Sequence, residues 1–336
     1  MTGVSAVVVA YRAGEGLGRC LDSLVGQDGL LETVVVDNGG GGSEIEEARG
    51  RDRVRVLDPG RNLGFAGGCN LGAEVAGGGV LLFLNPDTVV APGALERLAA
   101  TLEDTAIGIA MARLRLLDRP ELLNSSGSEV HVSGISWAGG YGEPADSVAE
   151  LRDVPAPSGA AMAVRADTFR ALGGFTEELF MYQEDLVLGW KARLAGLRVV
   201  IEPGADVYHD YEYGRNVAKH YLLERNRLVF VLSSYSPRLL LLLSPVLVST
   251  ELAMAALAAK EGWLRDKLRG WVWCARNSRW LARQRRETQR LRRVPDRELA
   301  PLLSATLTPA MIPVPAAAKA ANRLVEGYWR FARRAL

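Results

Sequence analysis

Short apolar runs recur along the N-terminal part of the chain. They are rich in β-branched residues, which is typical of strands buried on both faces of a parallel sheet, and they occupy positions 4–9, 33–36, 54–57 and 80–84. Segments of helix-forming residues separate them, at positions 17–25, 43–49 and 70–75. This alternation of strand and helix predicts an α/β domain built on a doubly wound, mostly parallel sheet.

In a sheet of this kind, ligands bind beyond the carboxyl ends of the strands. At or just past the ends of the four runs stand Tyr11, Asp37, Asp58 and Asp87, and three of these four are carboxylates. The first turn has no G-x-G-x-x-G motif for a dinucleotide, and the sequence has no P-loop motif. The pattern is therefore unlike that of a dehydrogenase or a P-loop protein.

Two residues are candidates for a divalent cation site. Asp87 follows a strand in the sequence Asn-Pro-Asp, and His209 follows a strand-like stretch at 199–201 and a Pro-Gly turn. Carboxylate oxygen suits Mg²⁺ and Mn²⁺, and imidazole is an acceptable ligand for Mn²⁺. Taken alone, Asp87 also fits an ordinary turn residue and His209 a structural or surface histidine, so both interpretations stay open.

A third polar element stands at the start of the helix predicted at 186–195. Glu184 and Asp185 lie in its first turn, where the helix dipole stabilises carboxylates. Neighbouring helical positions point about 100° apart, so the two side chains cannot both face one cleft. We expect one carboxylate to cap the helix or form an ion pair while the other takes part in catalysis. An acidic turn without a functional role is the alternative.

The C-terminal third has a different character. Its apolar segment at 239–259 has 21 residues, and the hydrocarbon core of a bilayer needs about 20. A basic region at 265–297 follows, and four of the seven tryptophans are interleaved with its first arginines. This pattern favours in-plane or re-entrant attachment to an anionic membrane surface. A packed soluble bundle is a second interpretation, and a spanning helix, which Pro245 and Glu251 disfavour, is a third.

Composition narrows the class of protein. The 336 residues carry a formal net charge of +1, which gives no overall attraction to nucleic acid. With 48% hydrophobic and 24% charged residues, the chain is neither disordered nor a polytopic membrane protein. Its three widely spaced cysteines predict reduced, buried thiols. No basic segment precedes the first apolar run, which is a poor signal peptide, so we expect the catalytic part to stay in the cytoplasm.

Three motifs occur in one order: RNLGFAGGCN at 61–70, LFLNPD at 82–87 and FMYQED at 180–185. In this order they resemble the family 2 inverting glycosyltransferases, and more narrowly the rhamnosyltransferase-like branch that builds bacterial cell-surface polysaccharides. The resemblance covers about residues 3–235. It implies a GT-A fold, a nucleotide-diphosphate-sugar donor carrying dTDP, UDP or GDP, and a divalent metal, Mn²⁺ or Mg²⁺.

The resemblance also implies roles for individual residues. Asp185 corresponds to the catalytic base, and Asp87 and His209 correspond to the metal site. The implied donor-binding residues are Ala10, Tyr11, Asp37, Arg61, Asn62, Gly67, Asn85 and Asp87. An inverting transfer needs one base for the acceptor hydroxyl and a cation for the departing diphosphate, and this set supplies both.

A basic and aromatic strip at 209–227 lies just before the apolar segment. Guanidinium groups form bidentate hydrogen bonds with phosphate, so the strip is a candidate binding site for the diphosphate of a lipid-linked acceptor. The candidate acceptor-binding residues are Glu184, Tyr211, Arg215 and Lys219. A helix face whose arginines are only solvated is the alternative.

These observations predict three segments. A GT-A glycosyltransferase domain occupies 1–235, an apolar and then basic, Trp-rich helical region for membrane association occupies 236–300, and a linker with a terminal amphipathic helix occupies 301–336. That last helix is a candidate for pairing subunits in a homo-oligomer. We expect a peripheral or monotopic protein at the cytoplasmic face of the cell membrane. It would transfer a rhamnose-like or other hexose to a lipid-linked or polysaccharide acceptor and would have no nucleic-acid partner.

Two other functions are open to a sheet of this type. A sugar-1-phosphate nucleotidylyltransferase would carry a G-x-G-x-R signature after the first strand, and the sequence lacks it. The other alternative is a degenerate transferase that serves as a non-catalytic membrane scaffold. Two features favour it, namely the four consecutive glycines at 39–42 and a metal motif with only one acid.

Overall fold

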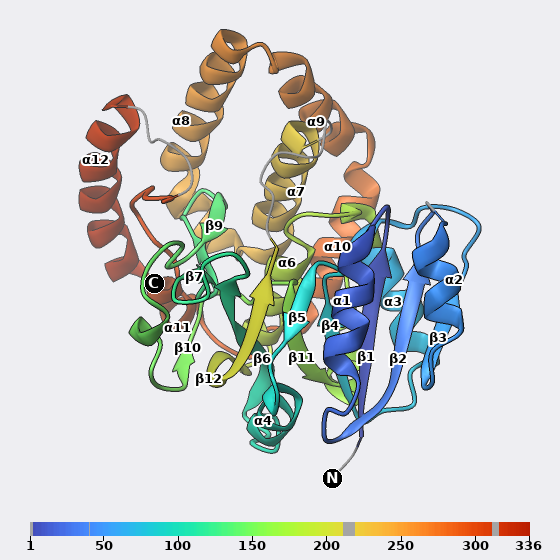
Figure 1. Ribbon diagram of the computed structural model, residues 1–336. Coiled ribbons are helices and arrows are strands. Elements are labelled where there is room, and N and C mark those ends of the chain that lie inside the picture. Colours follow the sequence, from blue (N-terminus) through green and yellow to red (C-terminus); the bar gives the residue numbers. More distant parts are fainter. Residues whose placement is uncertain (1–2, 40, 211–218, 311–315) are drawn as a thin grey trace. The chain divides into compact units, whose positions relative to one another are not determined.

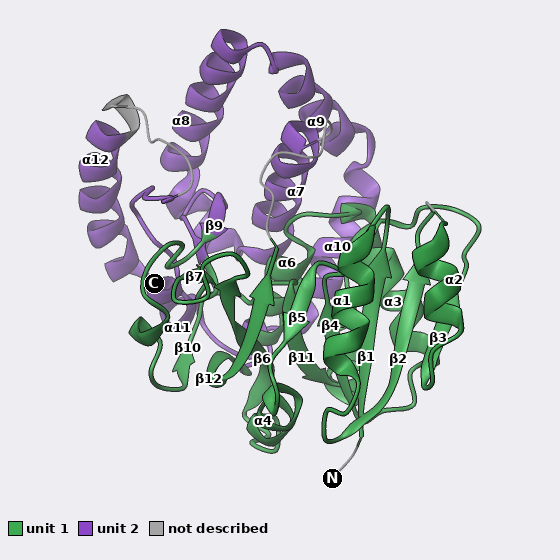
Figure 2. Cartoon of the chain, viewed as in Figure 1, with its two compact units in different colours: residues 1–128, 138–192, 197–212 green, residues 129–137, 193–196, 213–336 purple. Residues whose placement is uncertain are grey.

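The computed structural model describes residues 3–39, 41–210, 219–310 and 316–336 (Figure 1). The chain divides into two compact units (Figure 2). Unit 1 contains residues 1–128, 138–192 and 197–212, and unit 2 contains residues 129–137, 193–196 and 213–336.

Four parallel strands form one half of the sheet of unit 1. Their order is β4–β1–β2–β3, and they cover Val80–Leu84, Val4–Ala10, Leu30–Asp37 and Val54–Leu57. Every residue of β1 and β4 is buried, as expected for strands covered on both faces. The sequence predicts β3 and β4 with both bounds, and β2 begins three residues earlier than predicted.

The other half of the sheet is mixed. β11 (Ala161–Arg165) pairs antiparallel with β4 and with β6 (Ile107–Leu116), which pairs parallel with β12 (Arg198–His209). Short strands extend it, namely β5 (Thr88–Val90), β7 (Leu123–Ser125) and β10 (Arg152–Asp153). His209 ends β12 opposite Thr88 of β5. This pairing brings a histidine next to the residues that follow β4.

Helices alternate with these strands. They are α1 (Glu15–Leu24), α2 (Ser43–Arg49), α3 (Gly64–Val75), α4 (Ala94–Thr101), α5 (Ala166–Ala171) and α6 (Glu184–Leu194), with short 3₁₀ turns η1 (Ala145–Ser147) and η2 (Glu177–Leu179). α1 and α2 lie on one face of the parallel strands and α3 lies on the other (Figure 1). The predicted α/β class with a doubly wound sheet is therefore confirmed.

α3 begins at Gly64, six residues before its predicted start at Asn70. The Gly64 N–H donates to Oδ1 of Asn62 at 2.8 Å, which satisfies a backbone group at the start of the helix. Glycines crowd this first half of α3, and because glycine is a poor helix former, local propensity does not indicate the helix.

Close packing explains the glycines of α3. A Cβ on Gly68 would lie 2.8 Å from Cγ1 of Val9, and a Cβ on Gly72 would overlap the side chain of Val7. Both valines belong to β1, the central parallel strand. The glycines therefore let the helix approach the sheet at the level where the strands end.

Unit 2 is mainly helical. Its elements are the hairpin of β8 (Ser128–Val130) and β9 (Ser136–Ala138), α7 (Lys219–Ser234), α8 (Pro237–Glu261), α9 (Leu264–Arg276), α10 (Ser278–Arg290), α11 (Asp296–Leu299), α12 (Ala316–Ala332), and the 3₁₀ turns η3 (Ala300–Leu302) and η4 (Arg333–Ala335). Of the helices within the described ranges, α8 alone is long and apolar enough to cross a membrane. The three cysteines are free thiols, and two of them are buried.

The units depart from the boundaries predicted at 235 and 300. α7 packs against α9 and α10, so it belongs with the C-terminal helices and not with the N-terminal domain. Residues after 300 also pack within unit 2. Backbone hydrogen bonds of 2.8 Å join Ser304 to Val130 and Val132 in the β8–β9 hairpin. The terminal helix predicted within 301–336 is α12, which begins at Ala316.

Candidate functional site

The predicted donor-binding residues gather at one edge of the sheet in unit 1. Ala10, at the end of β1, lies opposite Asp37, at the end of β2. β4 pairs with the other side of β1 and ends immediately before Asn85. The structure therefore places Ala10, Asp37, Asn85 and Asp87 together at the carboxyl ends of three neighbouring strands, where α/β sheets bind ligands.

Asn38 holds this edge of the sheet together, although it was not among the predicted site residues. Its side chain is buried; Nδ2 donates to the carbonyl of Gly64 at 2.7 Å, and Oδ1 accepts from the N–H of Leu63 at 3.2 Å. Its own N–H donates to the carbonyl of Ala10 at 2.8 Å. One residue thus ties the ends of β1 and β2 to the first turn of α3. Its position directly after a buried strand is the sequence signal by which it could have been found.

The other predicted donor-binding residues differ in their exposure. Tyr11 is 49% exposed, and Cζ of Arg12 lies 5.4 Å from the centroid of its ring. Arg61 and Asn62 are exposed in the loop before α3. Gly67 is buried within α3, so its place suits helix packing rather than a direct contact with a ligand. The exposed residues leave a polar and aromatic rim at the strand ends.

The predicted metal pair meets in the structure. Nε2 of His209 lies 3.3 Å from Oδ1 of Asp87. The His209 side chain is 5% exposed and that of Asp87 is 37% exposed, so the pair opens on the side of the carboxylate. Within the described ranges, Oδ1 of Asp87 is a buried atom without a hydrogen-bond partner.

Asn124 sets the orientation of His209. This residue of β7 is buried, and its Oδ1 lies 3.0 Å from Nδ1 of the imidazole. An amide oxygen can only accept, so in the neutral imidazole Nδ1 carries the proton and Nε2 carries the lone pair. Nδ2 of Asn85, 3.3 Å from Nε2, is a donor and agrees with this tautomer. No sequence motif surrounds Asn124, so it was not among the predicted site residues.

These contacts test whether the residues suit a divalent cation. Nε2 of His209 and Oδ1 of Asp87 are both acceptors, and they face each other at a separation close to the roughly 3 Å between adjacent ligands of an ion with bonds of about 2.1 Å. A hydrogen bond to the second imidazole nitrogen is the usual support of a metal-binding histidine. No group of three or more His, Cys, Asp or Glu side chains forms a cation site in the part of the chain that the structure describes. The pair fits a cation that takes its other ligands from a substrate.

Asp185 lies at the start of α6 and is held by two backbone N–H groups. Gly159 donates to Oδ2 at 2.8 Å, and Leu186 donates to Oδ1 at 2.7 Å. Burial raises the pKa of this carboxyl, and the two N–H groups offset part of the rise. The next residue after Gly159, Ala160, accepts from the N–H of Asn85 at 3.0 Å. Two neighbouring residues, Gly159 and Ala160, thus connect Asp185 to Asn85, which lies beside Asp87 and His209.

Glu184 is placed differently from its neighbour. It is 6% exposed, and its Oε2 has no hydrogen-bond partner among the described residues. Burial raises its pKa well above the usual range, and the nearby charge of Asp185 adds to the rise. The acceptor role of Glu184 stays a prediction.

The segment that leads into α6 has an unusual backbone. Phe180 has φ of 66° and ψ of −63°, and the N–H of Met181 donates to the carbonyl of Leu179 at 2.8 Å, which forms a γ-turn of the rare, strained type. Tyr182 and Gln183 also have positive φ, at 69° and 65°. Strained residues of this kind cluster at functional sites, and these directly precede the two acids.

The remaining acceptor-binding candidates are Tyr211, Arg215 and Lys219. Tyr211 and Arg215 fall outside the described residues. Lys219 is the first described residue of α7 in unit 2, where burial lowers its pKa. Their acceptor role stays a prediction.

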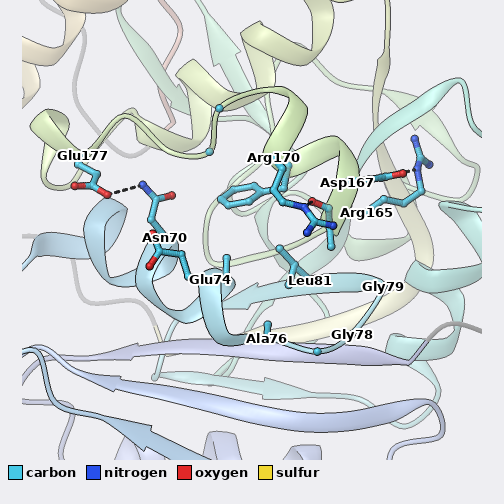
Figure 3. Close-up of a pocket in the computed structure, with 16 residues that line it drawn as sticks. Asn70, Glu74, Ala76, Gly78, Gly79, Leu81, Arg165, Asp167, Arg170 and Glu177 are labelled. Atoms are coloured by element: carbon cyan, nitrogen blue, oxygen red, sulfur yellow. Dashed lines mark hydrogen bonds and ion pairs between the residues drawn. The ribbon is translucent and has the colours of Figure 1, made fainter.

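A cavity of about 900 Å³ opens elsewhere in unit 1 (Figure 3). It is lined by α3, by α5 and by the glycines at 77–79 that precede β4. Its polar side chains bind one another: Nδ2 of Asn70 donates to Glu177 at 3.0 Å, and Arg165 lies 3.9 Å from Asp167. Because residues 77–79 precede β4, this cavity lies at the amino end of the strand, away from the metal pair.

A sheet of this topology, with carboxylates at the carboxyl edge and an aspartate–histidine pair beside them, defines the GT-A class of glycosyltransferase folds. The structure of GalNAc-T7 with UDP, GalNAc and Mn²⁺ has a TM-score of 0.58 at 18% identity, and the match covers 69% of this chain and 48% of that one. S. aureus TarS 1–349 in complex with UDP-GlcNAc has a TM-score of 0.52 at 16% identity, over 97% of this chain and 89% of that one. Likeness at these identities shows the fold.

The chain belongs to glycosyltransferase family 2. The family model, Glycosyl transferase family 2, matches residues 5–172, which is half of the chain. Among curated relatives, the N-acetylglucosaminyl-diphospho-decaprenol L-rhamnosyltransferase of Mycobacterium tuberculosis H37Rv is 29% identical over 250 residues, or 66% of this chain and 81% of that protein. This likeness supports the rhamnosyltransferase-like branch. The chain spans less than half the length of two uncharacterised relatives, one from M. tuberculosis and one from Sinorhizobium fredii.

Proposed function

We propose that the chain catalyses inverting, metal-assisted transfer of a hexose from a nucleotide-diphosphate donor to a hydroxyl of a lipid-linked or polysaccharide acceptor. The observation that carries this proposal is the meeting of Oδ1 of Asp87 and Nε2 of His209, 3.3 Å apart, at the edge where the parallel strands end. The family 2 match and the GT-A neighbours with UDP and UDP-GlcNAc support it.

Asp87 and His209 would hold the divalent cation, with Asn85 beside them and the donor diphosphate supplying further oxygens. When bound, a divalent cation stabilises the negative charge that develops on the departing nucleotide diphosphate. Two protein ligands suit a hard cation that is shared with substrate phosphates. The imidazole favours Mn²⁺ over Mg²⁺, and Mn²⁺ is named with GalNAc-T7.

The donor would bind along the strand ends. Tyr11, which is exposed, and the carboxylate of Asp37 would contact the nucleoside, and Arg61 would contact the diphosphate. Asn38 holds this edge together through its three hydrogen bonds. Because these contacts are fixed before binding, little ordering of the site itself is required when the donor arrives.

Asp185 would act as the catalytic base. The acceptor oxygen bonds to the anomeric carbon as the bond from that carbon to the diphosphate breaks, on the opposite face, which inverts the configuration. The acceptor hydroxyl proton passes to Asp185, and the nucleotide diphosphate leaves. A raised pKa makes this carboxylate a stronger base than an ordinary aspartate, and the N–H groups of Gly159 and Leu186 hold its orientation.

The sugar and acceptor are proposed by class. The M. tuberculosis relative is named as an L-rhamnosyltransferase that acts on N-acetylglucosaminyl-diphospho-decaprenol, which supports a rhamnose-like or other hexose and an acceptor that carries a lipid diphosphate. Lys219, together with Tyr211 and Arg215, is the proposed acceptor contact, because cationic side chains pair phosphate.

A transfer assay tests the proposal. The full chain is incubated with Mn²⁺, a panel of dTDP-, UDP- and GDP-sugars and a short-chain prenyl diphosphate sugar, and the product linkage is determined by NMR. We expect one donor to give a product of inverted anomeric configuration. Retained configuration would contradict the assigned base. Nucleotide binding without transfer to any acceptor would favour the non-catalytic scaffold.

A further inference from the structure

α8 has two different faces. One face is buried within unit 2 through Leu239, Leu243, Val246 and Ala258. The opposite face exposes Leu241 (74%), Val248 (59%) and Leu252 (66%). Spacings of seven and four residues place these three side chains on one stripe along the helix. Large apolar side chains that line one face are unusual on a protein surface and mark an interaction site.

Glu251, the acid in the middle of α8, is neutralised within unit 2. Oε2 of Glu251 accepts from Nζ of Lys267 at 2.8 Å and from Nε1 of Trp271 at 2.6 Å. Its Oε1 accepts from Arg227, and Lys267 and Arg227 also pair with Glu224. Lys267 and Arg227 are almost completely buried. This charge cluster, made of two cations and two carboxylates from α7, α8 and α9, has no net charge.

The cluster bears on how α8 can meet a bilayer. A helix of 25 residues is about 37 Å long, enough to cross the hydrocarbon core. A crossing would carry Glu251, together with the Arg227 and Lys267 bound to it, into the hydrocarbon, where charged side chains are costly. α7 and α9, with 16 and 13 residues, are too short to cross the hydrocarbon core beside α8. The cluster thus holds one face of α8 against the protein, and the stripe of Leu241, Val248 and Leu252 on the opposite face stays available to contact lipid.

The helices that follow α8 supply cations. α9 and α10 expose seven arginines and one carboxylate, Glu287; the arginines are Arg265, Arg269, Arg276, Arg279, Arg283, Arg286 and Arg290. α9 also exposes Leu268 (43%) and Val272 (46%) among them. This mixture of exposed apolar side chains and arginines is complementary to the anionic headgroups and acyl chains of a lipid surface.

α12 extends the apolar surface. The hydroxyl of Tyr328 donates to the carbonyl of Leu242 at 2.5 Å, which joins this helix to α8. Leu324 (78%) and Phe331 (71%) are exposed seven residues apart on α12. The helix therefore adds a second apolar stripe to unit 2.

We propose that α8 is a monotopic docking helix that lies in the plane of an anionic bilayer, with Leu241, Val248 and Leu252 inserted and the arginines of α9 and α10 on lipid phosphates. The charge cluster holds the opposite face of the helix and prevents it from crossing. This surface does not depend on the transfer reaction. It gives the chain a lipid interface whether or not the proposed function holds.

Vesicle binding tests the surface. The full chain is mixed with vesicles of phosphatidylcholine alone or of phosphatidylcholine with phosphatidylglycerol, and the bound fraction is measured by flotation. We expect binding that needs the anionic lipid and weakens in high salt. The variant Leu241→Ser/Val248→Ser/Leu252→Ser should bind at least about tenfold more weakly.

A matched control separates lipid insertion from a general loss of surface hydrophobicity. Leu31→Ser/Val25→Ser/Leu151→Ser changes the same residue types at exposed positions of unit 1 and should bind vesicles like the parent chain. Equal binding by both triple variants would overturn the proposal. So would a dimer of the parent chain, seen by light scattering, that is lost in the α8 variant while vesicle binding is unchanged.

Depth measurements distinguish an in-plane helix from a spanning one. In a chain with Cys274→Ser, a fluorescent label is attached to Leu241→Cys, Val248→Cys or Leu252→Cys, and lipid-borne quenchers at different depths are compared. The other two cysteines are buried. We expect the same shallow depth at all three positions. A depth that changes progressively from 241 to 252, over about 16 Å of helix, would show a spanning helix and overturn the proposal.

Discussion

Nδ1 of His209 lies 3.0 Å from Oδ1 of Asn124, a residue 85 positions earlier in the chain. This contact directs the lone pair of Nε2 toward Asp87. The amide therefore does for a histidine what a carboxylate or carbonyl does at many metal sites. Asn124 would be a positioning residue, because it would act on the proposed cation through the imidazole.

Replacing Asn124 tests this role. Asn124→Leu removes the acceptor that fixes the tautomer, and we expect Mn²⁺ affinity to fall by about 10- to 100-fold, measured by electron paramagnetic resonance of free Mn²⁺. Asn124→Asp keeps an acceptor at the same place and should retain binding. Unchanged Mn²⁺ affinity in Asn124→Leu would show that the contact is only structural.

Replacing Asp185 tests the base. Asp185→Asn keeps the shape of the side chain but cannot take a proton, so we expect the transfer rate to fall by about 10²- to 10⁴-fold while nucleotide affinity changes little. Asp167→Asn, at an exposed acid in α5, is the matched control and should remain active. Transfer at near the parent rate in Asp185→Asn would exclude this residue as the base.

The pH dependence of transfer follows from the environment of Asp185. A base acts only when ionised, so kcat/KM rises with pH and levels off above its pKa. Burial raises that pKa, and the acid limb should therefore lie at higher pH than for an ordinary aspartate. The residual activity of Asp185→Asn should lack this limb. A limb that persists in that variant belongs to another group.

Stability should depend on pH through Glu184. Its pKa is raised in the folded state, so its contribution to stability is fully present below the unfolded pKa and is lost as pH rises through the folded pKa. Glu184→Gln cannot ionise. We expect the free energy of unfolding of the variant, relative to the parent, to increase as pH rises through this range, measured by urea unfolding. A difference independent of pH would contradict the raised pKa.

Two glycines offer a paired test of the packing. Gly68→Ala places a Cβ against Val9 of β1, and we expect it to lower the free energy of unfolding by about 1–3 kcal/mol. Gly327→Ala, in α12, meets no atom within 4 Å and should raise helix stability by up to about 1 kcal/mol. Thermal and urea unfolding measure both. Equal effects of the two substitutions would mean that α3 does not need its close approach.

The parallel half of the sheet could be predicted from the sequence because its signals are local. β4 is a continuous apolar run, and its bounds coincide with the prediction. The start of α3 could not be predicted this way, since its glycines are selected by contact with β1 and lower local helix propensity. The division into units has no local signal either, because it depends on α7 packing against α9 and α10.

The residues of the candidate site also fall into those that local sequence signals predict and those that only tertiary contacts reveal. Asp87, Asp185 and His209 were found because each stands in a motif or after a strand. Asn124 and Gly159 were not, because their contacts, at 3.0 and 2.8 Å, exist only once β7 and β11 have joined the sheet. Residues that support a site from a distance along the chain leave no mark in a single sequence.

Calorimetric titration with UDP, dTDP and GDP, each with and without Mn²⁺, tests the central claim most directly. The parent chain should bind one of these nucleotides tightly only when Mn²⁺ is present, and both Asp87→Asn and His209→Ala should lose the metal-dependent part of the affinity while remaining folded. Binding of no nucleotide, or binding that is equally tight without Mn²⁺ and in both variants, would contradict the metal-assisted nucleotide-sugar site.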